Sequence, residues 1–525
     1  MKTGKPLEVD PEDLAGKICG SCFELIGLAR KVEVSNSPLI HYPTSEGPLS
    51  FFVSSPVESE TLPDMKALLV LFLFSSLKAV ERPHIILVMA DDQGYGDCGF
   101  TGHPYLKTPN LDAMAKASVI FDRFYAGAPV CSPTRASVMT GRNPVRVNVP
   151  NHGHYLRPHE TTIAEALKSS GYLTAHFGKW HIGSVQKESP TSPGGQGFDH
   201  WLSGLNFFDR NPYLSLNGKF EQFKGQGTII SMDYAIKHLK KNASKTPTFT
   251  VIWFPSPHGP HSETSSDPSL YQGQPHAPYY QEIALIDEQM GRLRKVLRDL
   301  NIADNTLLWY TSDNGGLVTK HSGGRAKKGS VYEGGLRVPS LIEYPAKLKP
   351  TRVAAPASAT DIYPTLLSLT GTKVEPQAPL DGIDLLPLIS GEQRTRSKPI
   401  GFWHQFTGGQ STRSDQLIKT LMEAQTNGKP NPLPERVLKN VNQFPKYGPQ
   451  SHRAGHAALL DWPYKIHAIY TKKITKWELY DLSKDPMETK PLNDHQKNRF
   501  LRMQKDLTAW QKSVLRSHAG EDYNQ

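Results

Sequence analysis

The sequence predicts an α/β fold with a large, mostly parallel central sheet flanked by helices, followed by a smaller C-terminal subdomain with a short antiparallel sheet. From about residue 83 onward, apolar runs of strand length alternate with helical stretches, as in chains that build a parallel sheet. The first run, residues 84–90 (HIILVMA), lacks polar alternation, which is typical of a strand covered on both faces. After Glu392 this alternation is lost, and two strand-like segments follow one another near the end of the chain.

The elements of the larger domain follow in chain order. Residues 161–170 (TTIAEALKSS) are expected to form a helix, and residues 172–177 (YLTAHF) the strand after it. A further strand is expected at 249–254 (FTVIWF). A long amphipathic helix at 281–300 then leads to a strand at 306–311 (TLLWYT).

Four of these strands end just before a polar cluster, which locates a candidate site. Ligands of open α/β sheets bind outside the carboxyl ends of the strands, so clusters that are distant in sequence are expected to converge there. The four clusters are Asp91-Asp92, Lys179-Trp180-His181, residues 257–261 (PHGPH) and residues 312–316 (SDNGG).

The C-terminal part of the chain has a different composition. Residues 393–451 are rich in Pro, Gly, Asn, Gln and basic residues with weak periodicity, and we expect an irregular segment there. Residues 464–470 and 477–482 resemble the two strands of a hairpin, and a final amphipathic helix is expected from about residue 495 to 515. We therefore predict a larger domain at 80–392 and a C-terminal subdomain at 393–525.

The N-terminal part contains a predicted export signal. Met65-Lys66 opens an apolar run, residues 67–74 (ALLVLFLF), which is followed by small and polar residues up to Ala79. This order describes a secretory signal peptide at 65–79, and the run is too short to span a bilayer as a helix. Residues 1–64 are then an upstream extension, either disordered or an artefact of gene prediction. The signal predicts an extracytoplasmic protein: lysosomal or secreted in a eukaryote, periplasmic in a bacterium.

Charge and cysteine content narrow the class of protein. Residues 1–64 hold five Lys/Arg and ten Asp/Glu, a net charge of −5, so the rest of the +10 chain carries +15. A basic body attracts anionic ligands at long range, although an ordinary basic surface explains the charge nearly as well. Four cysteines are too few for a disulfide scaffold. Cys19 and Cys22 lack a second pair and are expected to be incidental rather than a zinc site.

The segment from Cys131 to Arg142 (CSPTRASVMTGR) carries the central motif. It places a cysteine at the beginning of a short helix that starts near Pro133 and ends at Gly141. The free amides and the positive dipole end of a helix N-terminus favour an anion, and Arg135 adds a fixed cation one turn further on. For these five residues alone, a buried cysteine beside a helix cap is an equally good interpretation.

The motif resembles the Cys-x-Pro-x-Arg signature of the type I sulfatases, in the alkaline-phosphatase-like superfamily. A second family signature matches Gly171 to His181 (GYLTAHFGKWH), with Phe177 where a smaller or branched residue is usual. The resemblance runs from about Arg82 to Asp485 and is greatest to the arylsulfatase A / N-acetylgalactosamine-6-sulfatase branch. It implies an alkaline-phosphatase-like sandwich and hydrolysis of sulfate esters, on a sulfated sugar or glycosaminoglycan-type substrate.

The resemblance implies a nucleophile made by modification. In this family a formylglycine-generating enzyme oxidises the motif cysteine, so Cys131 would be the precursor of formylglycine. The hydrated aldehyde has two hydroxyls: one attacks sulfur and expels the alcohol, and the other allows sulfate to leave, which an unmodified thiol cannot do. Cys98 lies outside the motif and is expected to remain a thiol.

The resemblance also implies one bound calcium ion. Asp91, Asp92, Asp313 and Asn314 match the family's ligands, together with the modified residue 131. Three carboxylates and an amide oxygen form the hard, all-oxygen set that calcium prefers. Such an ion polarises the nucleophile and neutralises sulfate oxygens.

Cationic and titrating residues complete the implied site. Lys179 and Lys328 match the family's sulfate-binding lysines, with Lys327 as a neighbouring alternative, and Arg135 would hold the modified residue. His181 matches the histidine that orients or deprotonates the nucleophilic hydroxyl, and His258 the one that protonates the leaving alcohol. Three further histidines could lie on the substrate side: His152, His154 and His261.

Two alternatives to a sulfatase stay open at this point. A phosphodiester or phosphonate monoester hydrolase can use the same fold and nucleophile. A non-catalytic glycan-binding protein would result if Cys131 were never modified. Asn242-Ala243-Ser244 is an N-glycosylation sequon that a eukaryotic secretory pathway could use. No partner other than the carbohydrate substrate and the modifying enzyme is indicated, and no nucleic-acid motif is found in the sequence.

Overall fold

The computed structural model describes residues 41–42, 49–50, 82–439, 441–471 and 474–523. The chain divides into two compact units, Met1–Ala79 and Val80–Gln525. In the first unit only a short antiparallel pair, β1 (His41–Tyr42) and β2 (Leu49–Ser50), is described. The predicted signal peptide and the Cys19/Cys22 pair lie outside the described residues, as does most of the predicted extension.

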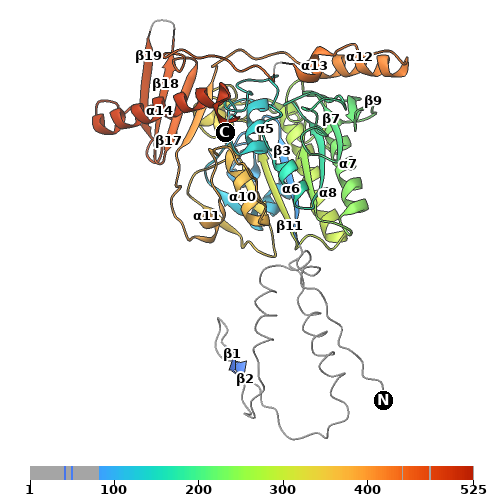
Figure 1. Ribbon diagram of the computed structural model, residues 1–525. Coiled ribbons are helices and arrows are strands. Elements are labelled where there is room, and N and C mark those ends of the chain that lie inside the picture. The colour runs from blue at the N-terminus through green and yellow to red at the C-terminus, as the bar shows by residue number, and fades with distance from the viewer. Residues whose placement is uncertain (1–40, 43–48, 51–81, 440, 472–473, 524–525) are drawn as a thin grey trace, which may run out of the picture. The chain divides into compact units, whose positions relative to one another are not determined.

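A large central sheet forms the core of the second unit (Figure 1). Its middle strands are parallel and its outer pairs are mostly antiparallel, which confirms the predicted fold class. In the described part of the chain the order across the sheet is β14 (Thr351–Val353), β4 (Val119–Phe121), β13 (Ser340–Glu343), β11 (Thr306–Ser312), β3 (His84–Ala90), β10 (Thr248–Trp253), β6 (Leu173–Lys179), β7 (His200–Gly204), β8 (Tyr213–Leu216) and β9 (Lys219–Gln222).

Helices cover both faces of this sheet (Figure 1). Strand β3 shows why, because alternate residues enter different cores: Ile85, Leu87 and Met89 pack in one, Ile86 and Val88 in the other. The first core is closed by α5 (Cys131–Thr140), α6 (Ile163–Ser169) and α10 (Ile362–Thr370), and the second by α4 (Pro109–Lys116), α7 (Gly227–Asn242) and α8 (Ala277–Asp299).

Local sequence signals set the helix ends. Thr162 and Glu165 form a reciprocal capping box at the start of α6. Helix α5 begins at Cys131, two residues before the expected start, and ends at Gly141, whose φ of 69° is left-handed and favours glycine. Smaller elements complete the domain: β5 (Phe124–Tyr125), β12 (Arg337–Val338), β15 (Ala357–Ser358), α9 (Glu333–Leu336), α11 (Leu386–Ser390) and the 3-10 turns Gly99–Thr101, Thr319–His321, Ala359–Asp361 and Glu521–Tyr523.

A four-stranded antiparallel sheet forms near the C-terminus, with α14 (Lys497–His518) packed across it (Figure 1). The predicted hairpin is present in it, and two strands that the sequence did not reveal extend it. The order is β16 (Ile400–His404), β17 (His456–Asp461), β18 (Tyr464–Tyr470) and β19 (Thr475–Asp481). The domain boundary at 392/393 stays a prediction, because residues 80–525 form one compact unit.

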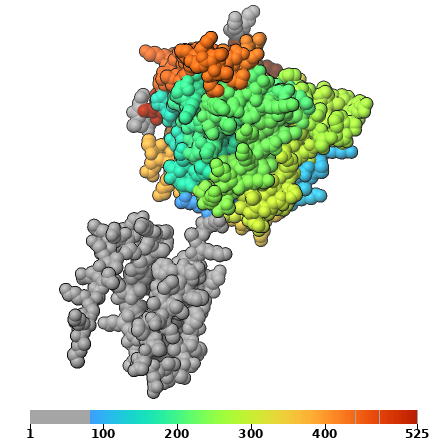
Figure 2. Space-filling view, turned by 90° about the vertical axis from the view of Figure 1, so that its right-hand side faces the viewer, coloured from blue at the N-terminus to red at the C-terminus, as the bar shows by residue number. Residues whose placement is uncertain are grey.

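The expectation of an irregular segment at 393–451 was wrong for part of its length. It contains α12 (Ser414–Thr426) and the short α13 (Glu435–Leu438) as well as β16. Figure 2 shows this orange stretch covering the green region of the chain, where α12 packs on β8 and β9. Buried Ile418 and Leu421 supply the apolar face, which the surrounding polar composition obscured in the sequence.

Candidate active site

The four strands that end in polar clusters are neighbours in the sheet. Their order is β11, β3, β10 and β6, all parallel, so their carboxyl ends lie at the same edge. The fold therefore brings Asp91, Lys179, His258 and Asp313 to one place, as the sequence pattern predicted.

Three buried carboxylates in this place each contact a cation. Asp91 Oδ2 accepts from Lys179 Nζ at 2.6 Å, and Asp313 Oδ2 from Arg135 Nη2 at 2.6 Å. Asp92 Oδ2 accepts from Lys328 Nζ, also at 2.6 Å. The acidic and basic charges thus balance three against three, so the charge of a bound cation can be offset by a bound anion.

Backbone and amide groups hold these side chains in position. The Asp92 backbone N–H donates to Asp313 Oδ1 at 3.1 Å, and Asn314 Nδ2 donates to Asp92 Oδ1 at 2.7 Å. Asp92 has a φ of 77°, a left-handed conformation that costs free energy for a non-glycine residue. Arg135 Nη1 donates to the backbone oxygen of Lys179 at 2.9 Å, which ties α5 to the end of β6.

Several buried polar atoms of this cluster lack a hydrogen-bond partner among the described residues. They include Asp91 Oδ1, Asn314 Oδ1, Arg135 Nε and both ring nitrogens of His181. Such atoms are costly to bury unless a ligand satisfies them. The two orphaned oxygens belong to the set of carboxylate and amide oxygens that suits calcium, so the residues present fit that ion.

Cys131 begins α5 beside this cluster. Its Sγ and one carboxylate oxygen each of Asp91 and Asp313 lie within 4.8 Å of one another. The N-cap residue, Val130, offers no side chain to the first amides of the helix, which therefore remain suited to an anion. Burial raises the pKa of the Cys131 thiol, although Lys179 and Lys328 oppose the rise. An unmodified thiol here is therefore protonated and a poor nucleophile.

The charges of the cluster shift the pKa values of its carboxyls in opposite directions. Burial raises the pKa of Asp91, but Lys179 and the other nearby cations outweigh it and hold the pKa below its usual range. Burial and the negative charge of Asp91 raise the pKa of Asp313. Two carboxylates this close repel each other, and a divalent cation relieves that repulsion.

The predicted histidines are not equivalent. Burial, Lys179 and Arg135 lower the pKa of His181 well below its usual value, so its ring is neutral near pH 7. His258 is partly exposed, with Nε2 3.9 Å from Asp92 Oδ2 and its ring stacked on Phe207 at 4.9 Å. His261 is engaged elsewhere, because its Nδ1 lies 3.3 Å from Glu282 Oε2.

Other predicted residues lie around the cluster. Lys328 contacts Asp92, whereas Lys327 is exposed, so the geometry favours Lys328. The pKa of His152 is lowered, first by partial burial and then by the nearby charges of Lys328 and Lys179. His152 therefore lies near both lysines, although part of its side chain is exposed. His154 contacts the Gly408 backbone oxygen at 3.0 Å. Cys98 is buried and free, as expected, with its Sγ 3.3 Å from Gln93 Nε2.

A second buried cluster was not foreseen from the sequence. We name Glu333, Glu488, Lys465 and His467 the brace cluster. Lys465 Nζ lies 2.9 Å from Glu333 Oε1 and 3.1 Å from Glu488 Oε1, and His467 Nε2 lies 2.8 Å from Glu488 Oε1. Glu488 Oε2 accepts from the Glu333 backbone at 2.7 Å. The brace cluster therefore ties the segment that follows Lys328 to the C-terminal sheet.

Phe207, which stacks on His258, was also missed. It follows β7 without a motif around it, so the only signal was an aromatic residue just after a buried strand.

The Lys328 segment has one further support: the backbone N–H of Gly329 donates to the Pro129 backbone oxygen at 2.8 Å. The loop before Cys131 and the loop that carries Lys328 are thereby joined.

The fold and this cluster at the carboxyl ends of the sheet define a hydrolytic enzyme of the alkaline-phosphatase-like class. The sulfatase family matches residues 83–372, more than half of the chain, and the chain belongs to that family. It is a sulfuric ester hydrolase.

Individual relatives agree with this assignment. Human arylsulfatase A is 32% identical over 376 residues, covering 64% of this chain and 74% of its own length. The ulvan-active sulfatase of Formosa agariphila is 31% identical over 367 residues, covering 65% of this chain and 71% of its own. The crystal structure of Ps i-CgsB in complex with k-i-k-neocarrahexaose superposes with a TM-score of 0.67 at 25% identity, covering 82% of this chain and 93% of that one.

Proposed function

We propose that the protein removes sulfate from a sulfated sugar or glycosaminoglycan-type substrate, using formylglycine formed from Cys131 and one calcium ion. The observation that carries the proposal is the meeting of Cys131 Sγ with the Asp91 and Asp313 carboxylates within 4.8 Å, at the uncapped start of α5. A nucleophile, a cation site and an anion site thus coincide.

The chain supplies the residues that would hold both groups. Asp91, Asp92, Asp313, Asn314 and the modified residue 131 would hold calcium, which supplies positive charge to polarise the nucleophile and the sulfate oxygens. A hydrated aldehyde at position 131 would supply one hydroxyl for attack on sulfur and a second for regeneration of the aldehyde.

The cations of the chain bind and orient the sulfate group. Lys179 and Lys328 carry the charges that face its oxygens, and Arg135 fixes the nucleophile loop through the Lys179 backbone and Asp313. With three carboxylates already balanced by three cations, an added divalent cation leaves the site positive, which favours an anionic ester.

The two histidines divide the proton transfers. His181 is neutral and has both ring nitrogens free of hydrogen bonds within the described chain, so it can accept the proton of the attacking hydroxyl. His258 is partly exposed and lies beside Asp92, so it would donate a proton to the departing alcohol. Burial lowers the pKa of His258, although Asp91 and Asp92 oppose this, so its protonated form and hence turnover are favoured by acidic conditions.

Turnover of two model esters tests the reaction class. We expect 4-nitrophenyl sulfate to be hydrolysed with a higher kcat/KM than bis(4-nitrophenyl) phosphate. Mass spectrometry of the peptide containing residue 131 should show that sulfur has been lost. Cys98→Ala, which alters the second buried free cysteine of the described residues, should leave turnover unchanged. Preference for the phosphodiester would assign the site to a phosphodiesterase, and intact sulfur in an active preparation would exclude formylglycine.

The substrate class rests on the relatives, two of which carry carbohydrate names: the ulvan-active sulfatase and the neocarrahexaose complex. Turnover of sulfated monosaccharides and of sulfated oligosaccharides would identify the sugar and the ring position. Activity on a steroid or phenol sulfate alone, with none on any sulfated sugar, would contradict a carbohydrate substrate.

Export through residues 65–79 is part of the proposal, as is modification by a formylglycine-generating enzyme during maturation. Asn242 of the sequon ends α7 and is partly exposed, where a glycan could be attached. Among the described residues, no helix has the length and apolar character needed to cross a membrane. Sequencing of the mature N-terminus would test the signal, since cleavage should occur close to Ala79.

A further inference from the structure

A groove runs along α14 on the outer face of the C-terminal sheet, apart from the residues of the candidate active site. Its first part, about 650 Å³, is lined by β18, β19, α14 and the segment before β17. A second part, about 820 Å³, shares His452 and Lys512 with the first and continues past Tyr447 to Arg516. We name the two together the α14 groove.

The α14 groove lies on the opposite face of the sheet from the brace cluster. In β18, Lys465 and His467 point toward Glu333 and Glu488, whereas Ile466 belongs to the apolar core beneath α14. Because neighbouring residues of a strand face opposite sides, the groove and the Lys328 segment are separated by the sheet itself.

The cations that line the first part of the groove have no acidic partners among the described residues. Arg453, Lys505 and Lys512 are exposed, and none of the three forms an ion pair with a carboxylate in the described part of the chain. None of the eleven residues that line the first part is acidic. Elsewhere on α14, Arg502 is paired with Asp461 and Asp506. The first part of the groove therefore keeps a positive charge, whereas in the second part Arg516 is paired with Glu521 at 3.6 Å.

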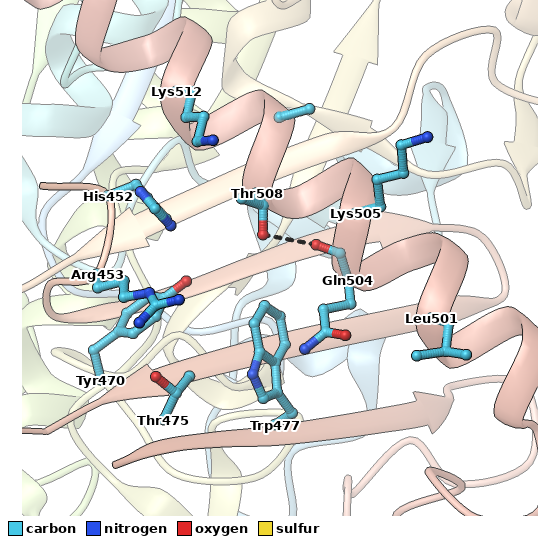
Figure 3. Close-up of a pocket in the computed structure, with 11 residues that line it drawn as sticks. His452, Arg453, Tyr470, Thr475, Trp477, Leu501, Gln504, Lys505, Thr508 and Lys512 are labelled. Atoms are coloured by element: carbon cyan, nitrogen blue, oxygen red, sulfur yellow. Dashed lines mark hydrogen bonds between the residues drawn. The ribbon is translucent and has the colours of Figure 1, made fainter. Parts of the chain in front are cut away.

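Aromatic rings form the floor of the groove between these cations (Figure 3). Trp477 of β19 is half-buried, and its ring meets Tyr470 at 6.4 Å and Phe500 at 6.5 Å, both edge to face. Tyr470 is itself fixed, because its hydroxyl donates to Gln511 Oε1 at 2.9 Å. A fixed indole face is a surface on which the apolar face of a sugar ring can pack.

The spacing of the cations suits an extended ligand. Lys505 and Lys512 are seven residues apart on one helix face, about 10 Å along the axis. Arg516, which is paired with Glu521, follows one turn later. Figure 3 shows both lysines on α14 above the strands that carry Tyr470 and Trp477. Alternating cations and aromatic rings match a polymer that alternates sulfate groups and sugar rings.

We propose that the α14 groove is a second binding site, for a sulfated polysaccharide chain, which holds the polymer while the active site acts on it. The proposal rests on the proposed function for the choice of sulfated polymer. A membrane surface would not reach an aromatic ring that lies in the floor of a groove. Nucleic acid is another polyanion that could bind the cations, and the test below distinguishes it from a sulfated polysaccharide.

The test compares full-length variants for binding and for turnover. The probes for binding are dextran sulfate, neutral dextran and inorganic polyphosphate, measured by isothermal titration calorimetry. The charge-reversal pair Lys505→Glu/Lys512→Glu should weaken dextran sulfate binding at least about tenfold and flatten its salt dependence. Lys240→Glu/Lys245→Glu, exposed on and after α7, makes the same change in net charge and should not alter binding.

Trp477→Ala separates sugar recognition from charge. It should weaken dextran sulfate but not polyphosphate, whereas the lysine pair should weaken both. Equal binding by wild type and the lysine pair overturns the proposal. Single-stranded DNA, added as a fourth probe, overturns it too if it binds more tightly than dextran sulfate and also depends on Trp477, and the same holds for polyphosphate. If Trp477→Ala does not fold, the exposed lysine pair still decides the location of the site.

Turnover keeps this proposal distinct from the proposed function. Both groove variants should hydrolyse 4-nitrophenyl sulfate at the wild-type rate, while kcat/KM for a sulfated polysaccharide falls through a higher KM. If no sulfate ester is turned over by any preparation, the proposed function fails. The comparison of dextran sulfate binding by wild type and the groove variants still tests whether the groove is a binding site. Loss of 4-nitrophenyl sulfate turnover in the Lys505→Glu/Lys512→Glu variant would contradict the claim that the groove is separate from the active site.

Discussion

The two buried charge clusters described here have similar composition, but they differ in whether their buried polar atoms have hydrogen-bond partners. In the brace cluster, Lys465, Glu333, Glu488 and His467 each use their side-chain nitrogens and oxygens in hydrogen bonds with one another, with Tyr125, with His456 or with the backbone. In the candidate active site, Asp91, Asn314, Arg135 and His181 keep buried polar atoms without partners in the described structure.

The difference separates stability from function. A buried cluster whose members satisfy one another holds structure together, while a cluster that leaves donors and acceptors open is completed only by a ligand. Changes in the first cluster should therefore cost stability, and changes in the second should cost activity or ligand response. Three predictions test this distinction, and a fourth concerns buried carboxyls outside both clusters.

The largest effect is expected for Cys131→Ala. Removing the nucleophile should reduce kcat for 4-nitrophenyl sulfate by about 10⁵- to 10⁶-fold, because no other side chain can take its place. The melting temperature should stay near the wild-type value, since alanine keeps the β-carbon and only the oxygen substituents of the modified residue are lost. A large fall in melting temperature would contradict the division between the two clusters.

Lys465→Met tests the brace cluster. It leaves Glu333 and Glu488 buried without their cation, so the free energy of unfolding should fall by about 3–5 kcal/mol in urea denaturation. Lys295→Met, which breaks an exposed pair with Asp299, should cost less than about 1 kcal/mol. Adding Glu333→Gln and Glu488→Gln to Lys465→Met should recover part of the loss. No recovery would mean that packing, not unpaired charge, dominates.

Calcium should stabilise the protein by binding at the candidate active site and not at the brace cluster. At about 100 times Kd, bound calcium contributes roughly 2.7 kcal/mol, so a chelator should lower the melting temperature. Asp313→Asn should abolish that response, whereas a brace variant such as Glu488→Gln should keep it. The idea is wrong if chelator and calcium leave the wild-type melting temperature unchanged.

The smallest effect concerns carboxyls on α8 that have hydrogen bonds but no Lys or Arg partner in the described structure. Burial raises the pKa of Glu282 to about 7 and of Asp287 to about 6, against opposing hydrogen bonds. As pH rises from about 4 to 7, the unfolded chain loses these protons first, so stability should fall, by on the order of 1–2 kcal/mol per group.

Urea denaturation at several pH values checks this prediction. Asp287→Asn should flatten the fall in stability between pH 4 and 7, because the substituted side chain no longer titrates. The exposed Asp494→Asn is the matched control and should leave the slope unchanged. Stability that rises over this range would show that other groups dominate the linkage.

The sequence predicted the central fold and the meeting of the site residues because both depend on local signals. The strands at 84–90, 172–177, 249–254 and 306–311 are apolar runs whose ends carry distinctive polar residues, and they lie side by side as β3, β6, β10 and β11. Their shared direction and edge follow from the α/β pattern alone, so the convergence needed no three-dimensional information.

The rest was hidden because its cause is tertiary. Lys465 and His467 occupy positions in β18 that a hairpin would ordinarily expose, and they are buried only because Glu333, more than a hundred residues earlier, lies against them. Helix α12 has an apolar face of few residues within a polar segment, and it is stabilised by the β8–β9 hairpin beneath it. Neither contact leaves a periodic signal.

Three of the four brace-cluster residues, Lys465, His467 and Glu488, lie near the end of the chain, which also affects when activity can arise. Protein chains are made from the N-terminus, and early parts can fold before later ones emerge. A nascent chain that stops before Lys465 already contains every proposed catalytic residue, yet it lacks the partners that hold Glu333 and the adjoining Lys328 segment. We therefore expect full competence only after the last strands have been synthesised, which delays hydrolysis until the polypeptide is nearly complete.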